Sequence, residues 1–251
     1  MNKINNISIV IITKNEGRII EKTLIQAKKL SDDIIVVDSG SVDNTVEIAK
    51  RFGTNVIEKP WEGYGVNKNF GAQVAKYDWI LSLDADEVPN DIFIKSVLQM
   101  ELNPCNIYQF KINTYFSGKK IRNEVFSPMW RYRLYYKYDH QWSDHLVHEK
   151  LTNIKTKLTK RVKGDILHYS YENEQHQILK LENYALSQAK QWQTNQYKPT
   201  PIWVFCSAVS RFLKHYFLHF GFLYGREGYI HAKNEYSMVI KKLKFYKNLI
   251  G

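Results

Sequence analysis

Short apolar runs, separated by longer segments of mixed polarity, organise the first hundred residues. Each run ends in polar residues and has the length of a strand buried on both faces. The runs lie over Ile7–Ile12, Asp33–Asp38, Asn55–Glu58 and Asp78–Leu83. Helical spacing follows them over about residues 18–30, 45–52, 72–76 and 90–102, the third after a glycine-containing loop at 61–71. Successive strand–helix units predict an α/β fold with a mostly parallel, Rossmann-like sheet flanked by helices.

The pattern changes in the middle of the chain. Alternating polarity over Asn106–Tyr115 and Trp130–Tyr136 predicts strands in an antiparallel setting. From Glu172 the spacing is helical, and Pro199 and Pro201 interrupt it. We therefore expect one α/β domain over residues 1–198, with a first half at 1–103 and a second at 104–170, followed by a helical extension at 199–251.

An amphipathic helix is expected within this C-terminal extension. Its apolar positions recur at spacings of three and four residues, at Ile202, Phe205, Val209, Phe212, Tyr216 and Phe220. Cations in the same stretch, such as Arg211 and Lys214, cost too much at the centre of a bilayer for a spanning helix. The apolar stripe therefore either packs against the α/β domain or lies on an anionic membrane surface.

The charge of the chain is concentrated towards its C-terminus. The 251 residues include 36 Lys and Arg against 25 Asp and Glu, a formal net charge of +11. Residues 151–251 hold 16 of those cations and 6 of those acids, so most of the excess lies there. Such a charge suits phosphate-rich partners, but the chain has no helix-turn-helix, zinc finger or RNA-binding sheet motif, which disfavours nucleic acid.

The cysteines and the N-terminal residues favour a cytoplasmic location. Cys105 and Cys206 are the only cysteines, which excludes a disulfide scaffold and a cysteine-based zinc module. Met1–Ile7 is polar and lacks the basic start, apolar run and cleavage site of a signal peptide. We expect a cytoplasmic protein, peripheral on the cytoplasmic face of the inner membrane, where its basic extension meets anionic lipid.

The strongest chemical signal is Asp84-Ala-Asp86-Glu87 at the end of a predicted strand. Ligands of open α/β sheets bind just beyond the carboxyl ends of strands. Two carboxylates separated by one residue can hold a hard cation, which offsets negative charge on a departing diphosphate. The alternative is an acidic turn that caps the next helix, which has no need of two aspartates. The motif therefore predicts a Mg2+ or Mn2+ site.

Polar side chains also follow the first two predicted strands. Asp38 ends the second strand, and its carboxylate can accept hydrogen bonds from a nucleobase or a ribose. Asp43 suits a turn as well as it suits a ligand. Lys68, in the glycine-containing loop, either meets a phosphate or is solvated. The first strand ends in Thr13, Asn15 and Glu16, so three strand ends present polar groups to one crevice.

Four motifs, in this order, resemble those of the family-2 glycosyltransferases, which have the GT-A fold. They are Ile7–Glu16, Ile34–Thr45, Asn67–Gly71 and Trp79–Glu87, and they cover the first hundred residues. The resemblance implies a nucleotide-sugar donor, usually linked to uridine diphosphate (UDP). It also implies that Asp38 lies near the base, Asp84 near the ribose and Asp86 on a Mg2+ or Mn2+ ion.

More narrowly, the chain is similar to the branch of β-1,4-glucosyltransferases that build the lipopolysaccharide core. This similarity rests on Thr13–Glu16, Val147–Glu149 and Gly221–Gly228. It implies transfer of a hexose, with glucose first among the candidates, to a lipid-anchored or cell-envelope glycan.

An inverting transfer needs a base that removes the proton of the acceptor hydroxyl. By chemistry Asp144, His148 and Glu149 all qualify, since partial burial raises the pKa of a carboxylate into a useful range. The family resemblance favours Glu149, with Asp144 second. His168 follows a short apolar run and is either a further metal ligand or a structural histidine at a strand end.

The main alternative function is nucleotidyl transfer on a similar α/β sheet. Such enzymes usually carry a glycine-rich basic loop directly after the first strand. The segment Thr13–Gly17 has no such loop, which favours glycosyl transfer.

Overall fold

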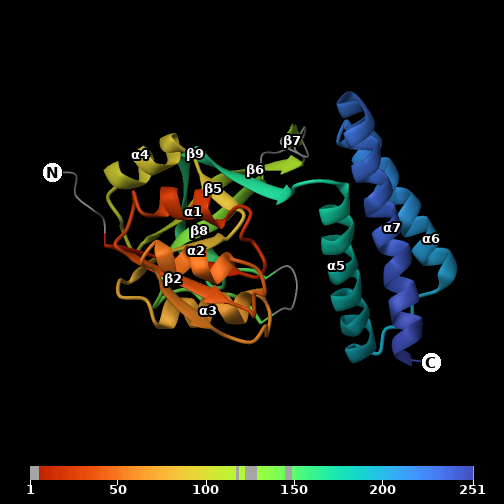
Figure 1. Cartoon of the computed structure of the whole chain (residues 1–251), viewed down its shortest axis with the longest axis horizontal. Helices are drawn as coiled ribbons and strands as arrows, with labels where there is room; N and C mark the ends of the chain where they lie inside the picture. Colours follow the sequence, from red (N-terminus) through yellow and green to blue (C-terminus); the bar gives the residue numbers. More distant parts are fainter. Residues whose placement is uncertain (1–5, 117–118, 122–128, 145–148, 251) are drawn as a thin grey trace. The chain divides into compact units, whose positions relative to one another are not determined.

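The computed structural model describes residues 6–116, 119–121, 129–144 and 149–250 (Figure 1). The chain divides into two compact units. The first unit comprises residues 1–113 and 129–169, and the second comprises residues 114–128 and 170–251.

Nine strands of the described residues form one mixed sheet, in the order β3-β2-β1-β4-β8-β6-β9-β5, with β7 paired to β6. The strands are β1 (Ile7–Thr13), β2 (Asp33–Asp38), β3 (Asn55–Glu58), β4 (Trp79–Asp84), β5 (Glu87–Pro89), β6 (Asn106–Phe116), β7 (Lys119–Ile121), β8 (Met129–Tyr136) and β9 (Leu158–Tyr171). β1 pairs in parallel with β2 and β4, and β2 with β3, whereas β8 joins β4 and β6 in antiparallel fashion. The parallel and antiparallel halves therefore meet between β4 and β8.

The first unit buries both faces of its parallel strands. The helices are α1 (Ile20–Ala27), α2 (Thr45–Arg51), α3 (Tyr64–Gln73) and α4 (Asp91–Gln99). On one face Ile9, Ile11 and Val36 belong to a core that includes residues of α1, α2 and α4. On the other face Val10 and Val37 belong to a second core with Ala72 of α3. Burial on both faces explains why β1 and β2 are apolar runs without alternation.

Most expected elements of the parallel half are present, but the expected start of the third helix was wrong. Residues 61–71 were expected to form a loop, whereas the helix already begins at Tyr64. Two of its glycines serve close packing. A Cβ on Gly65 would lie 2.0 Å from the carbonyl oxygen of Ser143, and one on Gly71 would lie 2.3 Å from Cγ1 of Val10. The glycines that suggested a loop therefore let a helix approach its neighbours closely.

The second unit is helical, with α5 (Glu174–Thr194), α6 (Pro201–Leu213) and α7 (Gly225–Ile250). A π-helical turn over Lys214–Leu218 and a 3-10 turn over Gly221–Tyr224 join α6 to α7. Figure 1 shows α5 and α6 each running beside α7. The C-terminal helical extension expected from the sequence is confirmed.

Small and apolar side chains hold these three helices together. Leu181 and Ala185 of α5 pack with Met238, while Val204 and Ala208 of α6 pack with Val239. Because α5 packs on α7, the second unit includes residues 170–198, which we had expected to belong to the α/β domain. None of the helices that the structure describes is both long and apolar enough to cross a membrane.

Candidate active site

Three strand ends lie side by side at one edge of the sheet. Thr13 of β1 is in register with Asp38 of β2, and Ile12 of β1 is in register with Asp84 of β4. The hydroxyl oxygen of Thr13 is buried and has no hydrogen-bond partner within the described chain. Polar strand ends therefore meet at one edge of the sheet, and a polar atom there is left available for a ligand.

The Asp38 carboxylate is folded into the loop that follows it. It accepts hydrogen bonds from the backbone N–H groups of Gly40 (3.0 Å) and Ser41 (2.8 Å) and from the Ser41 hydroxyl. The Asp38 side chain is buried, and Gly40 has a positive φ of 80°. Asp38 thus fixes the course of the loop that follows β2.

The polar residues after β1 fasten this loop from the other side. The amide oxygen of Asn15 accepts a hydrogen bond from the Val42 N–H (2.8 Å), and the Asn15 N–H donates to the Ser41 hydroxyl (2.8 Å). The Glu16 N–H donates to the Thr45 hydroxyl (2.9 Å), and the Glu16 carboxylate lies 3.0 Å from the Arg18 guanidinium. Asn15 and Glu16 therefore hold two loops in place.

Asp43 has the turn role that the sequence left open. Its carboxylate accepts hydrogen bonds from the backbone N–H groups of Gly17 (3.0 Å) and Thr45 (3.1 Å). Burial raises the pKa of this carboxyl, but the hydrogen bonds from Thr45 and Gly17 outweigh that effect and hold the pKa below its usual value. Asp43 thus joins the start of α2 to the loop after β1.

A buried arginine fixes the turn that carries the acidic motif. Arg133, from β8, donates to both carboxylate oxygens of Glu87, with its Nε 2.9 Å from Oε2. The same Glu87 oxygen accepts the backbone N–H of Asp84 at 3.2 Å. Burial lowers the pKa of Arg133, but the charges of Glu87 and Asp84 reverse this and raise it. The Arg133 guanidinium is therefore a permanent cation beneath the motif.

Lys68 connects the acidic motif to the expected base. Its ammonium is buried, 3.1 Å from Oδ1 of Asp84 and 2.6 Å from Oε1 of Glu149, and lies over the Trp142 ring at 4.8 Å from its centroid. Burial lowers the pKa of Lys68, but the charges of Asp84 and Glu149 outweigh it. In turn, burial raises the pKa of Asp84, and the charges of Lys68 and Arg133 bring it below its usual value.

Helix α3 also brings the segment around Trp142 to this cluster. The side chain of Asn69 exchanges two hydrogen bonds of 2.8 Å with the backbone of Trp142. Of the three candidate bases, Glu149 lies in the cluster, whereas Asp144 is exposed. His148 lies outside the described residues.

The pairing of β5 with β9 places His168 beside Asp86. Nε2 of His168 lies 3.4 Å from Oδ1 of Asp86, and the Tyr169 N–H donates to the Asp86 carbonyl oxygen (2.9 Å). Burial lowers the pKa of His168, but the negative charge of Asp86 raises it above its ordinary value.

These groups fit a divalent cation in part. Within the described ranges, no three His, Cys, Asp or Glu side chains are grouped closely enough to hold a metal ion by themselves. Asp86 and His168 supply two donors of suitable chemistry, and Asp84 faces Lys68 and Arg133. Mn2+ and Mg2+ accept phosphate oxygens as further ligands, so this donor set fits a cation that arrives with a diphosphate.

Arg133 is a site residue that the sequence did not single out, and the contact between Asn69, in the motif Asn67–Gly71, and Trp142 was not expected. Arg133 lies in the aromatic strand Met129–Tyr136, where it alternates with Arg131 as a surface residue also would. No sequence signal therefore distinguishes Arg133 from a surface arginine.

Residues 8–157 match the profile of Glycosyl transferase family 2. The matched range covers more than half of the chain, so the protein belongs to this family of glycosyltransferases. The four ordered motifs indicated the same family and the α/β GT-A fold, and both predictions are confirmed. The lipopolysaccharide-core branch remains an expectation.

Relatives extend the similarity beyond the profile. An uncharacterized glycosyltransferase of Rickettsia bellii is 31% identical over 241 residues, which are 89% of this chain and 80% of that protein. The chondroitin synthase of Escherichia coli is 33% identical over 107 residues, 39% of this chain and 16% of that enzyme. Among solved structures, the chain is similar to glucosyl-3-phosphoglycerate synthase from Mycobacterium tuberculosis, with 24% sequence identity and a TM-score of 0.34. The alignment covers 45% of this chain and 44% of the synthase chain.

Proposed function

We propose that this chain is an inverting hexosyltransferase. It moves a hexose, with glucose as the first candidate, from a UDP-sugar to a lipid-anchored or cell-envelope glycan such as the lipopolysaccharide core. The observation that carries the proposal is the meeting of Thr13, Asp38 and Asp84 at one sheet edge, beside Lys68 and Glu149. In open α/β sheets this edge is where nucleotides bind.

We assign the donor to the crevice between the loops that follow β1, β2 and β4. The loop held by Asp38 and Asn15 forms the side for the base, and Asp84 lies on the side for the ribose. The Thr13 hydroxyl is available for the nucleotide. The ammonium of Lys68, directly beside Asp84, suits a phosphate of the donor.

We assign the divalent cation, Mn2+ or Mg2+, to Asp86 and His168. Such a cation offsets the negative charge that develops on the diphosphate as it leaves. Arg133 supports this arrangement because it holds Glu87, and through it the Asp84 backbone, in one conformation.

We assign the role of base to Glu149. In the transfer, the acceptor oxygen bonds to the anomeric carbon while its proton passes to the Glu149 carboxylate. The bond from the anomeric carbon to the diphosphate oxygen breaks, and the electron pair leaves with UDP. Attack from the face opposite the diphosphate inverts the anomeric configuration. Lys68, 2.6 Å from Glu149, orients the carboxylate for this step.

We place the enzyme on the cytoplasmic face of the inner membrane, as a peripheral protein. The helices α6 and α7 with their connecting turns, residues 201–250, contain eight Lys and Arg and two Glu. A membrane-bound, anionic acceptor is complementary to that charge.

The proposal is tested with purified protein, Mn2+ and a panel of UDP-, GDP- and CMP-sugars, by thermal shift and by release of free nucleotide. We expect UDP-hexoses to stabilise the protein in the presence of Mn2+ and to yield UDP. Asp86→Asn should abolish UDP release, whereas Asp91→Asn, at the exposed start of α4, should leave it unchanged. Full activity of Asp86→Asn would refute the metal assignment.

A further inference from the structure

Helix α6 is apolar on the side turned away from α7 as well as on the side that packs against it. The side towards α7 carries Val204 and Ala208, both buried, and Arg211, whose Nε lies 2.7 Å from Oε2 of Glu235. The opposite side carries large apolar residues, with Ile202 78% and Phe205 56% exposed. In a water-soluble bundle, the side of an amphipathic helix that faces away from its neighbours is polar. The outer side of α6 is therefore an unpartnered apolar surface.

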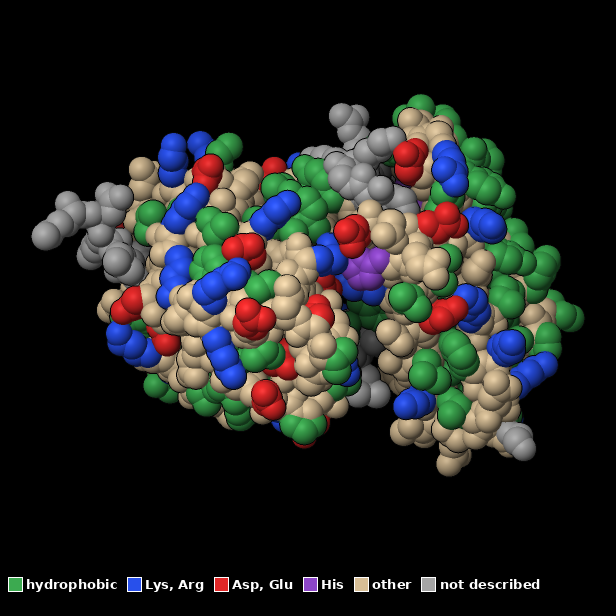
Figure 2. Space-filling model, viewed as in Figure 1, with side chains coloured by type: hydrophobic (Ala, Val, Ile, Leu, Met, Phe, Trp, Pro, Cys, Tyr) green, Lys and Arg blue, Asp and Glu red, His purple; other side chains and the backbone are tan. Residues whose placement is uncertain are grey.

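This surface continues into the turns after α6. We define the α6 face as the exposed side chains of Ile202, Phe205, Leu213, Phe217, Leu218 and Leu223. Figure 2 shows hydrophobic side chains gathered over α6 and the turns that follow it. Exposed apolar patches of this kind mark sites of contact with a protein or a membrane.

The charges around the α6 face select an anionic partner. The sequence contains no Asp or Glu between Glu182 and Glu227, a stretch that includes all of α6 and both turns. Lys214 lies in the first turn and Arg226 at the start of α7, and both are exposed. Large apolar side chains, flanked by cations without acidic residues between them, are characteristic of helices that lie on anionic lipid.

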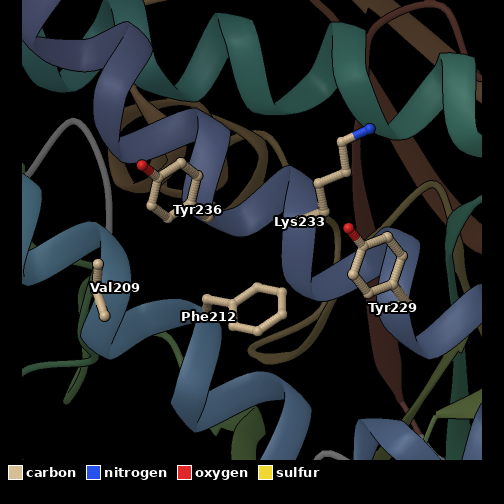
Figure 3. A pocket seen from close by; sticks show the side chains of 5 residues that line it. All are labelled: Val209, Phe212, Tyr229, Lys233 and Tyr236. Carbon is tan, nitrogen blue, oxygen red and sulfur yellow. The ribbon is translucent and has the colours of Figure 1, made fainter.

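A pocket of about 330 Å³ lies beside this face, between α6 and α7 (Figure 3). Val209 and Phe212 line it from α6, and Tyr229, Lys233 and Tyr236 line it from one side of α7. The Phe212 ring packs edge-on against Tyr229, at 6.2 Å between centroids. Lys233 is the only charged residue of this lining, and it is exposed. Figure 3 shows the Lys233 ammonium directed away from Val209 and Phe212, so the cation lies at the rim of the pocket. An aromatic and aliphatic wall with one cation at its rim fits the first methylene groups of a lipid with the phosphate at the rim.

We propose that the α6 face inserts into the acyl region of an anionic phospholipid membrane, and that the pocket between α6 and α7 holds the phosphate of one lipid against Lys233. This inference deepens the proposed function, because it names the surface that brings the enzyme to a membrane-bound acceptor. It predicts that binding to lipid needs both the apolar side chains of α6 and the cation in the pocket.

The experiment is sedimentation of the full chain with vesicles of phosphatidylglycerol and phosphatidylcholine, and with vesicles of phosphatidylcholine alone. We expect binding to the anionic vesicles and weaker binding to the neutral ones. The double variant Phe205→Ser, Leu213→Ser should lower the partition coefficient by roughly tenfold or more. Ile92→Ser is the matched control, because Ile92 is equally exposed on α4 of the first unit. It should bind vesicles like the wild-type protein.

The pocket is tested with a second pair of variants on α7. Lys233→Gln should weaken binding to the anionic vesicles by roughly fivefold and leave binding to neutral vesicles unchanged. Lys244→Gln removes another exposed cation of α7 that does not line the pocket, and it should have a smaller effect. Equal losses from the two variants would overturn the assignment of a lipid phosphate to the pocket.

Two other results would overturn the α6 face as a lipid surface. One is equal vesicle binding by the double variant and the wild-type protein. The other is a wild-type dimer in solution that the double variant converts to a monomer, since a second copy of the chain would then cover the face. A protein that binds vesicles but releases no UDP from any UDP-hexose would keep this inference and refute the proposed function.

Discussion

Arg133 and Glu87 form a buried, bidentate ion pair at the end of the acidic motif Asp84–Glu87. Nε of Arg133 lies 2.9 Å from Oε2 of Glu87, and Nη2 lies 2.5 Å from Oε1. Both side chains are almost completely buried. Because Glu87 also accepts the Asp84 N–H, the pair determines the backbone conformation from Asp84 to Glu87. Stability and site geometry therefore depend on the same contact.

Arg133→Met should destabilise the first unit and weaken the metal site together. It leaves the Glu87 carboxylate buried without its cation, which typically costs about 3–5 kcal/mol of unfolding free energy. The Asp84–Glu87 turn then loses its support, so the apparent affinity for Mn2+ should also fall. Urea unfolding measures the first effect, and Mn2+ titration of UDP release measures the second.

The control for this prediction is Arg51→Met. Arg51 lies 3.3 Å from Glu21 in an ion pair whose side chains are both more than half exposed. Water solvates these charges, so the urea midpoint and the Mn2+ titration should change little. A loss of stability as large as that of Arg133→Met would show that burial of the Arg133–Glu87 pair is not the cause.

Lys68→Met should impair both folding and donor binding, because it leaves the carboxylates of Asp84 and Glu149 close together without the cation between them. We expect UDP release to fall by about a hundredfold or more. Adding Glu149→Gln removes one of the two charges and should restore part of the stability but none of the activity. If the two substitutions have additive effects on stability, Lys68 does not couple these carboxylates.

Glu149→Gln and Asp144→Asn separate the two candidate carboxylate bases. With Glu149 as the base, Glu149→Gln should reduce kcat by about 10²–10⁴-fold and leave donor affinity almost unchanged. Asp144→Asn should retain most of the activity, because Asp144 is exposed and Glu149 lies in the charged cluster. The measurement is transfer to an acceptor glycan at several pH values. The reverse ranking of the two variants would assign the base to Asp144.

The sequence predicted the parallel half of the sheet well because burial leaves a direct pattern there. β1 and β2 are buried on both faces, so their residues are continuously apolar and end sharply at polar groups. β9 was harder to recognise, because Leu158–Tyr171 is mostly polar and exposed at its start. The helix α3 was taken in part for a loop, because its glycines serve close packing with Val10 and Ser143.

In the candidate site, residues with a local sequence signal could be predicted, whereas a residue whose role depends on strand pairing could not. Asp84 and Asp86 are recognisable from their position after a strand. The role of Arg133 depends on the pairing of β8 with β4, which no local pattern reveals. The Asp38 carboxylate accepts hydrogen bonds from its own loop, and its expected contact with the donor stays a prediction.

A second titratable cluster lies in the helical unit. The ring centroid of His215 is 5.0 Å from those of His219 and His231, and Nε2 of His215 lies 3.9 Å from Oε2 of Glu235. Burial lowers the pKa of His215 to about 4. The positive charges of the neighbouring histidines and Arg211 also lower it, whereas the negative charge of Glu235 raises it. Burial also lowers the pKa values of His219 and His231.

The helical unit should therefore lose stability in mild acid. A histidine whose pKa is lowered by folding binds its proton more readily when unfolded, so its contribution is complete above pH 6.5 and disappears as the pH falls to about 4. For His215 the change is at most roughly 3 kcal/mol. The opening free energy of α6 and α7, from hydrogen exchange over this pH range, measures it. His215→Gln should flatten the pH dependence, whereas His176→Gln, at a partly exposed position of α5, should not. An unchanged slope for His215→Gln would show that other groups cause the acid sensitivity.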